Sequence, residues 1–226
     1  KDNNIFKYGS NNFLLENKKI TKIIFQTSLL LPEPYVIKLI KKLFPSYSYF
    51  HFNDEDIIQF IKENPLKEFP NSIKKFNEFK GAHKADFFRY YFLYINGGIF
   101  LDSDAMINME ISNIIEDYEE IYIESNFFKS FKHVFNGFIC TYPKSPVIYN
   151  ALKHMYNCDK IVDYQMFCRE LYVILYKINP SNIKIYKETI FKSDNNNNSC
   201  IYNDKNQKIL THYFQDKIVS RNHCIY

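Results

Sequence analysis

The chain has 226 residues, of which 46% are hydrophobic and 18% aromatic. This is enough apolar material for one packed domain, so we expect a single domain over residues 1–226 rather than a disordered chain. The formal net charge of +4 is spread along the sequence without a long basic block. The charge therefore gives no argument for a nucleic-acid partner, whereas a mild positive balance suits an anionic small substrate.

The cysteines bear on the compartment. Five are present, and no CxxC motif occurs. The odd number argues against a zinc site or a disulfide framework and favours reduced thiols in a cytosol-like compartment. No apolar run approaches the roughly 18–20 residues that span a membrane, so we expect no transmembrane segment in this sequence. Because the sequence begins at Lys1, a removed leader or anchor stays open and the localisation is left unknown.

Strand-like and helix-like segments alternate along the chain. Runs of β-branched and aromatic residues predict strands, and apolar residues at helical spacing predict helices. The expected elements are, in chain order, a strand at 22–28, a helix at 33–45, a strand at 46–53, a helix at 55–63 capped by Asp54, a helix at 72–95 broken near Gly81, strands at 99–101, 120–125 and 135–142, helices at 145–156 and 163–177, a strand at 182–188, a polar loop or hairpin tip at 193–200, and a last strand around 210–214. This alternation predicts an α/β layer structure.

Two carboxylates follow an apolar run in the sequence GGIFLDSD (97–104). Because side chains alternate along a strand, we expect Asp102 and Asp104 to point the same way where the strand ends. Carboxylates this close repel each other unless a cation lies between them, and Mg²⁺ and Mn²⁺ prefer oxygen ligands. The pair therefore predicts a metal site at the edge of a sheet. A solvated turn that happens to contain two aspartates is the alternative, because the motif is short.

A second charged pair precedes the aspartates. Asp86 and Arg89 are three residues apart and share one face of a helix that is otherwise apolar and aromatic. The pair is either a structural salt bridge or a substrate contact. In the second case, the guanidinium fork of Arg89 would donate to hydroxyls or phosphates, and Asp86 would accept from sugar hydroxyls.

Taken together, AHKADFFRYYFLYINGGIFLDSD (82–104) resembles the signature of the DXD-type sugar transferases. That family includes the Golgi α-1,6-mannosyltransferases and the capsular polysaccharide transferases, with the large glucosylating toxins as distant relatives. A small residue, Asp-x-x-Arg-Tyr, Gly-Gly and Asp-x-Asp occur here at the family's spacing. The flanking segments 19–28 and 136–148 also agree, so the resemblance covers roughly residues 19–156 and fades over the last third.

The resemblance implies a GT-A fold, which is a Rossmann-like mixed sheet flanked by helices. It also implies an enzyme that transfers a hexose from a UDP- or GDP-sugar to a glycan, protein or other hydroxyl acceptor, with retention of anomeric configuration. Residues 19–156 would form the donor-binding core and residues 157–226 the acceptor side. Mn²⁺ is the expected ion, with Mg²⁺ as the alternative.

Roles for single residues follow from the same resemblance, position by position. Asp104 would ligate the metal directly, and Asp102 would contact the ribose and the metal's water shell. Asp86 and Arg89 would hold the donor sugar. The remaining donor contacts would be Gln26, Thr27 and Ser28 beside the base, and Asn136 beside the sugar or the acceptor.

One departure from the family concerns its frequent C-terminal motif with His and Trp, because this chain has no Trp. His212, in THYFQD, is the best remaining candidate for a third contact to the metal or the diphosphate. A structural histidine beside a strand is the alternative. Asp216 and Ser220 are weaker candidates for the same contact.

Other protein classes also use an apolar run followed by DxD. A haloacid-dehalogenase-like phosphatase usually has Thr or Val soon after the motif, whereas Ala105 and Met106 follow here. A polymerase-β-like nucleotidyltransferase has Gly-Ser farther upstream. Neither class explains Asp86 and Arg89. The alternative from a different functional class is a nucleotide-sugar-binding domain without transfer activity.

Overall fold

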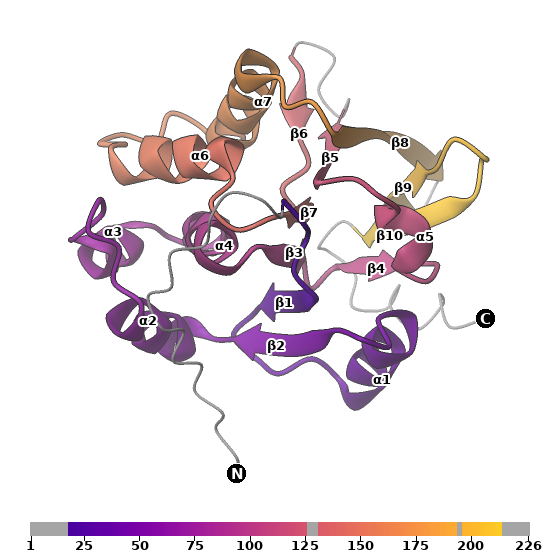
Figure 1. Cartoon of the computed structure of the whole chain (residues 1–226), viewed down its shortest axis with the longest axis horizontal. Helices are drawn as coiled ribbons and strands as arrows, with labels where there is room; N and C mark the ends of the chain where they lie inside the picture. Colours follow the sequence, from indigo (N-terminus) through magenta and orange to yellow (C-terminus); the bar gives the residue numbers. More distant parts are fainter. Residues whose placement is uncertain (1–17, 126–130, 194–195, 214–226) are drawn as a thin grey trace.

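The computed structural model describes residues 18–125, 131–193 and 196–213. In these ranges the elements are β1 (Ile23–Thr27), α1 (Pro34–Leu43), β2 (Ser48–Phe52), α2 (Asp54–Glu63), α3 (Ser72–Glu78), α4 (Ala82–Asn96), β3 (Gly98–Leu101), β4 (Ala105–Ile107), α5 (Ser112–Ile115), β5 (Glu120–Ser125), β6 (His133–Val134), β7 (Phe138–Thr141), α6 (Pro146–Tyr156), α7 (Met166–Ile178), β8 (Ile183–Ser193), β9 (Asn196–Tyr202) and β10 (Lys208–Tyr213) (Figure 1). The predicted alternation of strands and helices is confirmed.

The strands form one mixed sheet in the order β2-β1-β3-β7-β5-β8-β9-β10-β4, and β6 pairs with β5. β1 runs parallel to β2 and β3, and β5 runs parallel to β8, whereas the other pairs are antiparallel. β3 and β4 are far apart in this order, yet only residues 102–104 join them. Because so short a link reaches only about 10–14 Å, the sheet must curl until its last strand returns beside β3.

Helices cover both faces of this sheet, and each face has its own apolar core (Figure 1). Helices α2, α3, α4, α6 and α7 pack on one face, whereas α1 and α5 pack on the other. The strand side chains alternate between the two cores: Phe25 and Phe100 point to the first, and Ile24 and Ile99 to the second. This is the mixed sheet flanked by helices that the resemblance implied.

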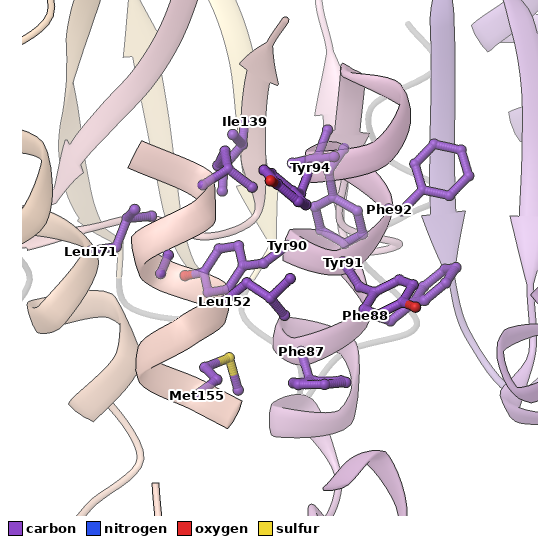
Figure 2. Packing of buried hydrophobic residues seen from close by; sticks show 14 of the residues in the cluster. Phe87, Phe88, Tyr90, Tyr91, Phe92, Tyr94, Ile139, Leu152, Met155 and Leu171 are labelled. Atoms are coloured by element: carbon purple, nitrogen blue, oxygen red, sulfur yellow. The ribbon is translucent and has the colours of Figure 1, made fainter. Parts of the chain in front are cut away.

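Helix α4 is buried on nearly all sides, as expected for a helix that is apolar around its whole circumference. Figure 2 shows Phe88 and Phe92 on the side of the strands, and Tyr90 directed toward Leu152 of α6. The ring of Phe92 lies 4.2 Å, centroid to centroid, from that of Phe25 in β1. This packing fixes the helix on which Asp86 and Arg89 stand.

The turn from α4 into β3 requires two glycines. Gly97 and Gly98 have φ values of +63° and +99°, a region that side chains disfavour. A Cβ on Gly98 would also lie 2.7 Å from the carbonyl oxygen of Ile23, and one on Gly97 would lie 2.8 Å from that of Thr141. The glycines therefore let β3 start directly after the helix and pair closely with its neighbours.

Some local predictions were wrong. Helix α2 is capped by Asn53, not Asp54, because the Asn53 side chain accepts hydrogen bonds from the backbone N–H groups of Glu55 and Asp56. For the polar loop or hairpin tip predicted at 193–200, β8 and β9 do pair antiparallel across the segment, but residues 196–202 form strand β9, since β8 and β10 provide partners on both sides. Strands β4 and β6 and the short helix α5 were not predicted.

The cysteines and the helix lengths of the described residues bear on the predicted thiols and membrane segments. Cys140, Cys158, Cys168 and Cys200 are free thiols, and Cys224 lies outside the described residues. Over those residues, no helix has the length and apolar character needed to cross a membrane.

Candidate active site

Arg89 joins the two charged motifs that the sequence singles out. Its Nη2 lies 3.1 Å from Oδ1 of Asp102 and its Nη1 lies 3.4 Å from Oδ1 of Asp86. The guanidinium also lies over the ring of Phe100, 4.0 Å from its centroid. Only 3% of the Arg89 side chain is exposed. The arginine therefore acts as a buried clamp between α4 and the end of β3, and its neighbours raise its pKa against the effect of burial.

Asn136 completes this clamp from the loop before β7. Its backbone carbonyl accepts a hydrogen bond from Arg89, and its side-chain Nδ2 donates to Oδ1 of Asp86 over 3.1 Å. The hydroxyl of Tyr90 donates to Oδ1 of Asn136 over 3.0 Å. His83, one turn before Asp86 on α4, places Nδ1 3.2 Å from the second oxygen of that carboxylate. Asp86 is thus held in one orientation by three different side chains.

Both aspartates of the DxD motif lie after the end of strand β3, not within it. β3 ends at Leu101, and residues 102–105 form a turn in which the N–H of Ala105 donates to the carbonyl of Asp102. The strand alternation behind the prediction therefore does not apply. Both carboxylates nevertheless line the same cavity, because the turn directs them to it.

Asp102 has an unusual acidity for a carboxyl group. Burial raises its pKa, Arg89 lowers it, and Asp104 raises it again, with a net rise from 3.8 to about 6. The carboxyl is still mainly ionised at neutral pH. At neutral pH the negative charge of Asp102 therefore lowers the free energy of unfolding.

His212 reaches Asp104 through a strand pair that was not predicted. β10 pairs with β4, with His212 opposite Ala105, and the N–H of Tyr213 donates to the carbonyl of Asp104 over 2.9 Å. This register places Nε2 of His212 3.7 Å from Oδ2 of Asp104. The two residues, which are far apart in the sequence, therefore face one another.

Charge around His212 decides its protonation. Burial lowers its pKa, but the carboxylates of Asp104 and Glu188 outweigh burial and raise the pKa from 6.5 to about 9. Glu188, on β8, lies 3.5 Å from Nδ1 of the histidine and has a lowered pKa, because its hydrogen bonds outweigh the effect of burial. Without a metal, the imidazole is therefore cationic at neutral pH.

These side chains meet in a cavity of about 1000 Å³. The predicted residues that line it are Thr27, Ser28, Asp86, Arg89, Asp102, Asp104, Asn136 and His212. Gln26, which was also predicted to contact the donor, does not line the cavity in the described chain, because it is only 1% exposed and its amide makes hydrogen bonds inside the protein. Its Nε2 donates to the carbonyl of Asp102 and its Oε1 accepts from Tyr49. Gln26 thus holds the backbone of the DxD turn through the carbonyl of Asp102. Asp216 and Ser220 lie outside the described residues.

The donor set can be tested against the metal that the resemblance implies. In the ranges described, no three His, Cys, Asp or Glu side chains are grouped to hold a metal ion. Asp104 and His212 offer two donors on the cavity wall, which suits Mg²⁺ or Mn²⁺, because such ions often keep waters and share substrate phosphates. Five carboxylates line the same cavity (Asp54, Asp86, Asp102, Asp104 and Glu188), against three permanently cationic side chains (Lys80, Lys84 and Arg89). The chemistry of the site therefore fits a divalent cation.

Comparison with known protein families identifies a match over part of the chain. Residues 33–121 match the family described as "glycosyltransferase sugar-binding region containing DXD motif". The predicted resemblance is thereby confirmed over a stretch that includes Asp86, Arg89, Asp102 and Asp104. The match supports glycosyl transfer as the class of activity.

Two solved glycosyltransferase structures are similar to this chain at low sequence identity. The PaToxG glycosyltransferase is 14% identical, with 70% of each chain covered and a TM-score of 0.46. A glycosyltransferase involved in the glycosylation of the major capsid of PBCV-1 is 11% identical, with 73% of this chain and 81% of that chain covered and a TM-score of 0.44. No curated protein matches the sequence.

Sequence reasoning missed several residues of the site. Glu188 was seen only as part of a strand, and its neighbours Lys187 and Thr189 gave no signal that its carboxylate is buried. His83 stands three residues before Asp86, a helical spacing that indicates contact. Tyr164 and Phe135 also line the cavity, and neither carries a sequence pattern that distinguishes it from the many other aromatic residues.

Proposed function

We propose that the protein is a metal-dependent, retaining glycosyltransferase that moves a hexose from a UDP- or GDP-sugar to a hydroxyl acceptor. The acceptor would be a glycan or a protein. Transfer breaks the bond between the anomeric carbon and the diphosphate, and forms a bond from that carbon to the acceptor oxygen. The acceptor proton is released, and the nucleoside diphosphate leaves.

One observation carries the proposal. Asp86 and Arg89 from α4, Asp102 and Asp104 from the turn after β3, and His212 from β10 converge on one cavity. A structural salt bridge alone does not require the second aspartate or a histidine facing it. The cavity, at about 1000 Å³, is at the upper end of the size range typical of ligand pockets. It has room for a donor beside an acceptor group.

The residues of the chain would divide the work as follows. Asp104 and His212 would hold Mn²⁺ or Mg²⁺, which when bound supplies Lewis-acid stabilisation of the leaving diphosphate. Asp86, held by Arg89 and Asn136, presents an oriented acceptor to sugar hydroxyls. Arg89 also fixes Asp102, whose remaining oxygen is directed toward the ribose and the metal's water shell in this proposal.

The other donor and acceptor contacts belong to the same proposal. Thr27 and Ser28, after β1, border the nucleotide base, whereas Gln26 acts through the backbone of Asp102. Residues 157–226 supply the acceptor side, an assignment supported by Tyr164, Gln165 and Cys168 on the cavity wall. Retention would be tested by NMR assignment of the anomeric configuration of the product.

Donor binding is the first experiment. Thermal unfolding would be followed with UDP- and GDP-sugars, each in Mn²⁺ and in EDTA. A ligand that binds only the folded state adds about 2.7 kcal/mol of stability at a hundred times its dissociation constant. A shift that needs Mn²⁺ and occurs with one nucleotide would support the donor site and identify the base. Equal melting temperatures under all conditions would contradict it.

Turnover is tested with Asp104→Asn, which keeps the size of the side chain and removes its charge. Hydrolysis or transfer of the donor should fall by ~10²–10³ or more, since a stabiliser of the developing negative charge is lost. Asp204→Asn is the matched control, because Asp204 is exposed and pairs with Lys184 away from the cavity. Near-normal turnover in Asp104→Asn would contradict the proposal. Donor binding without turnover by the wild-type protein would instead favour the binding domain without transfer activity.

A further inference from the structure

We propose that Glu188 is a positioning residue that aims the imidazole of His212 at Asp104. The inference rests on the proposed function, in which Asp104 and His212 hold the metal. Glu188 itself would stay outside the coordination sphere. Its contribution is to fix the orientation of a ligand, as carboxylates behind metal-bound histidines commonly do.

The carboxylate is built into the wall of the cavity. Glu188 is 5% exposed. The hydroxyl of Ser125, at the end of β5, donates to its Oε2, and the hydroxyl of Ser199, on β9, donates to its Oε1. Ser125 and Ser199 are themselves 2% and 0% exposed. A buried carboxylate with a hydroxyl donor on each oxygen cannot rotate freely, so its position is fixed by three strands.

The same carboxylate faces the inner nitrogen of the histidine. Oε1 of Glu188 lies 3.5 Å from Nδ1 of His212, whereas Nε2 on the other side of the ring lies 3.7 Å from Oδ2 of Asp104. Phe135 packs against the ring, with its centroid 4.4 Å from that of the imidazole. When Nδ1–H donates to Glu188, the neutral ring presents the lone pair of Nε2 toward Asp104. Glu188 therefore selects both the orientation and the tautomer that a metal ligand needs.

A neighbouring carboxylate provides a matched control. Glu124, on β5, lies opposite Lys187 in the pairing with β8 and is 4% exposed. It is paired with Lys132 and accepts a hydrogen bond from Tyr176. It is absent from the lining of the cavity in the described chain. Loss of Glu124 thus removes a buried carboxylate of the same sheet without touching His212.

The test measures Mn²⁺ binding to the full chain without any donor sugar. The free ion would be followed by electron paramagnetic resonance in the wild type and in Glu188→Leu, Glu188→Gln and Glu124→Leu. We expect the Leu variant at 188 to bind Mn²⁺ ~100-fold more weakly and Glu188→Gln ~10-fold more weakly, the range seen when such supporting groups are lost. Glu124→Leu should stay within about twofold of wild type, since it leaves the supporting carboxylate in place.

Crystal structures of the metal-free wild type and of the variants give a second measurement. The histidine ring should keep its orientation in Glu188→Gln, whose amide oxygen can accept from Nδ1 at the position of Oε1, and should turn away from Asp104 in Glu188→Leu. An unchanged ring in Glu188→Leu would overturn the proposal. If Glu188→Leu does not fold, Mn²⁺ affinity in Glu188→Gln equal to that of the wild type would overturn it. If the wild type itself binds no Mn²⁺, the metal in the proposed function is wrong, and the ring orientation alone decides the role of Glu188.

Discussion

Asp102→Asn should make the metal-free protein more stable while it removes activity. The pKa of Asp102 is about 6 in the folded protein against 3.8 for an unperturbed group. Because the folded state holds this proton more tightly, the ionised carboxylate destabilises the fold. That penalty is absent below pH 3.8, grows as the pH rises, and is complete above about 6.

The size of the effect follows from the same two values. A difference of this size corresponds to about 3 kcal/mol. The side chain of Asp102 is 29% exposed to solvent in the cavity, which reduces the expected gain to about 1–2 kcal/mol. In a protein of this size, the melting temperature should rise by about 2–8 °C. The Asn Oδ1 can still accept the hydrogen bond from Arg89, so the clamp is retained.

The assay is thermal unfolding in EDTA at pH 7.5 and at pH 4, with Asp204→Asn as the exposed control. The gain should be present at pH 7.5 and shrink at pH 4, where the wild-type carboxyl takes up its proton. The control should melt within about 1 °C of wild type, because single surface charges contribute little. A variant that melts below the wild type at pH 7.5 would refute the reasoning and show that the charge of Asp102 stabilises the fold.

Two further substitutions test the clamp and its surroundings. Arg89→Met should lower the free energy of unfolding by about 3–5 kcal/mol in urea titrations, because the buried Asp86 and the partly buried Asp102 lose their cation; a loss below 1 kcal/mol would contradict the clamp. Gly137→Ala would place a Cβ 2.1 Å from Cζ of Phe135 and 2.7 Å from Oδ2 of Asp102. It should lower stability by about 1–3 kcal/mol and turnover by roughly 10-fold or more. Unchanged kinetics would show that this contact relaxes harmlessly.

The juxtaposition of Asp86, Arg89, Asp102 and Asp104 was predictable because these residues are close in sequence. Residues 82–104 combine a helix, two glycines and a short strand, so local spacing fixes how Asp86, Arg89 and the aspartates relate. The approach of His212 to Asp104 depends on the pairing of β10 with β4. A strand as short as β4, at Ala105–Ile107, leaves almost no periodicity to detect.

Strand β9 shows the opposite failure, in which local composition gave the wrong answer. Asn-rich sequence disfavours strands, yet residues 196–202 pair with neighbours on both edges. Tertiary partners therefore override the weak local preference. Glu188 was missed for a related reason, because its significance comes from Ser199 and His212, which only the folded sheet places beside it.

Because the sheet curls, the approach of His212 to Asp104 depends on strands that are distant in the sequence. Contacts between residues distant in sequence form only after long loops have closed, and such closure slows folding. The approach of His212 to Asp104 requires β8, β9 and β10 to assemble in register and then return to β4. A chain interrupted anywhere in this hairpin series can retain the contacts of Arg89 with Asp86 and Asp102 and still lack the approach of His212 to Asp104. In the proposed function, Mn²⁺ affinity would therefore report whether β10 has paired with β4.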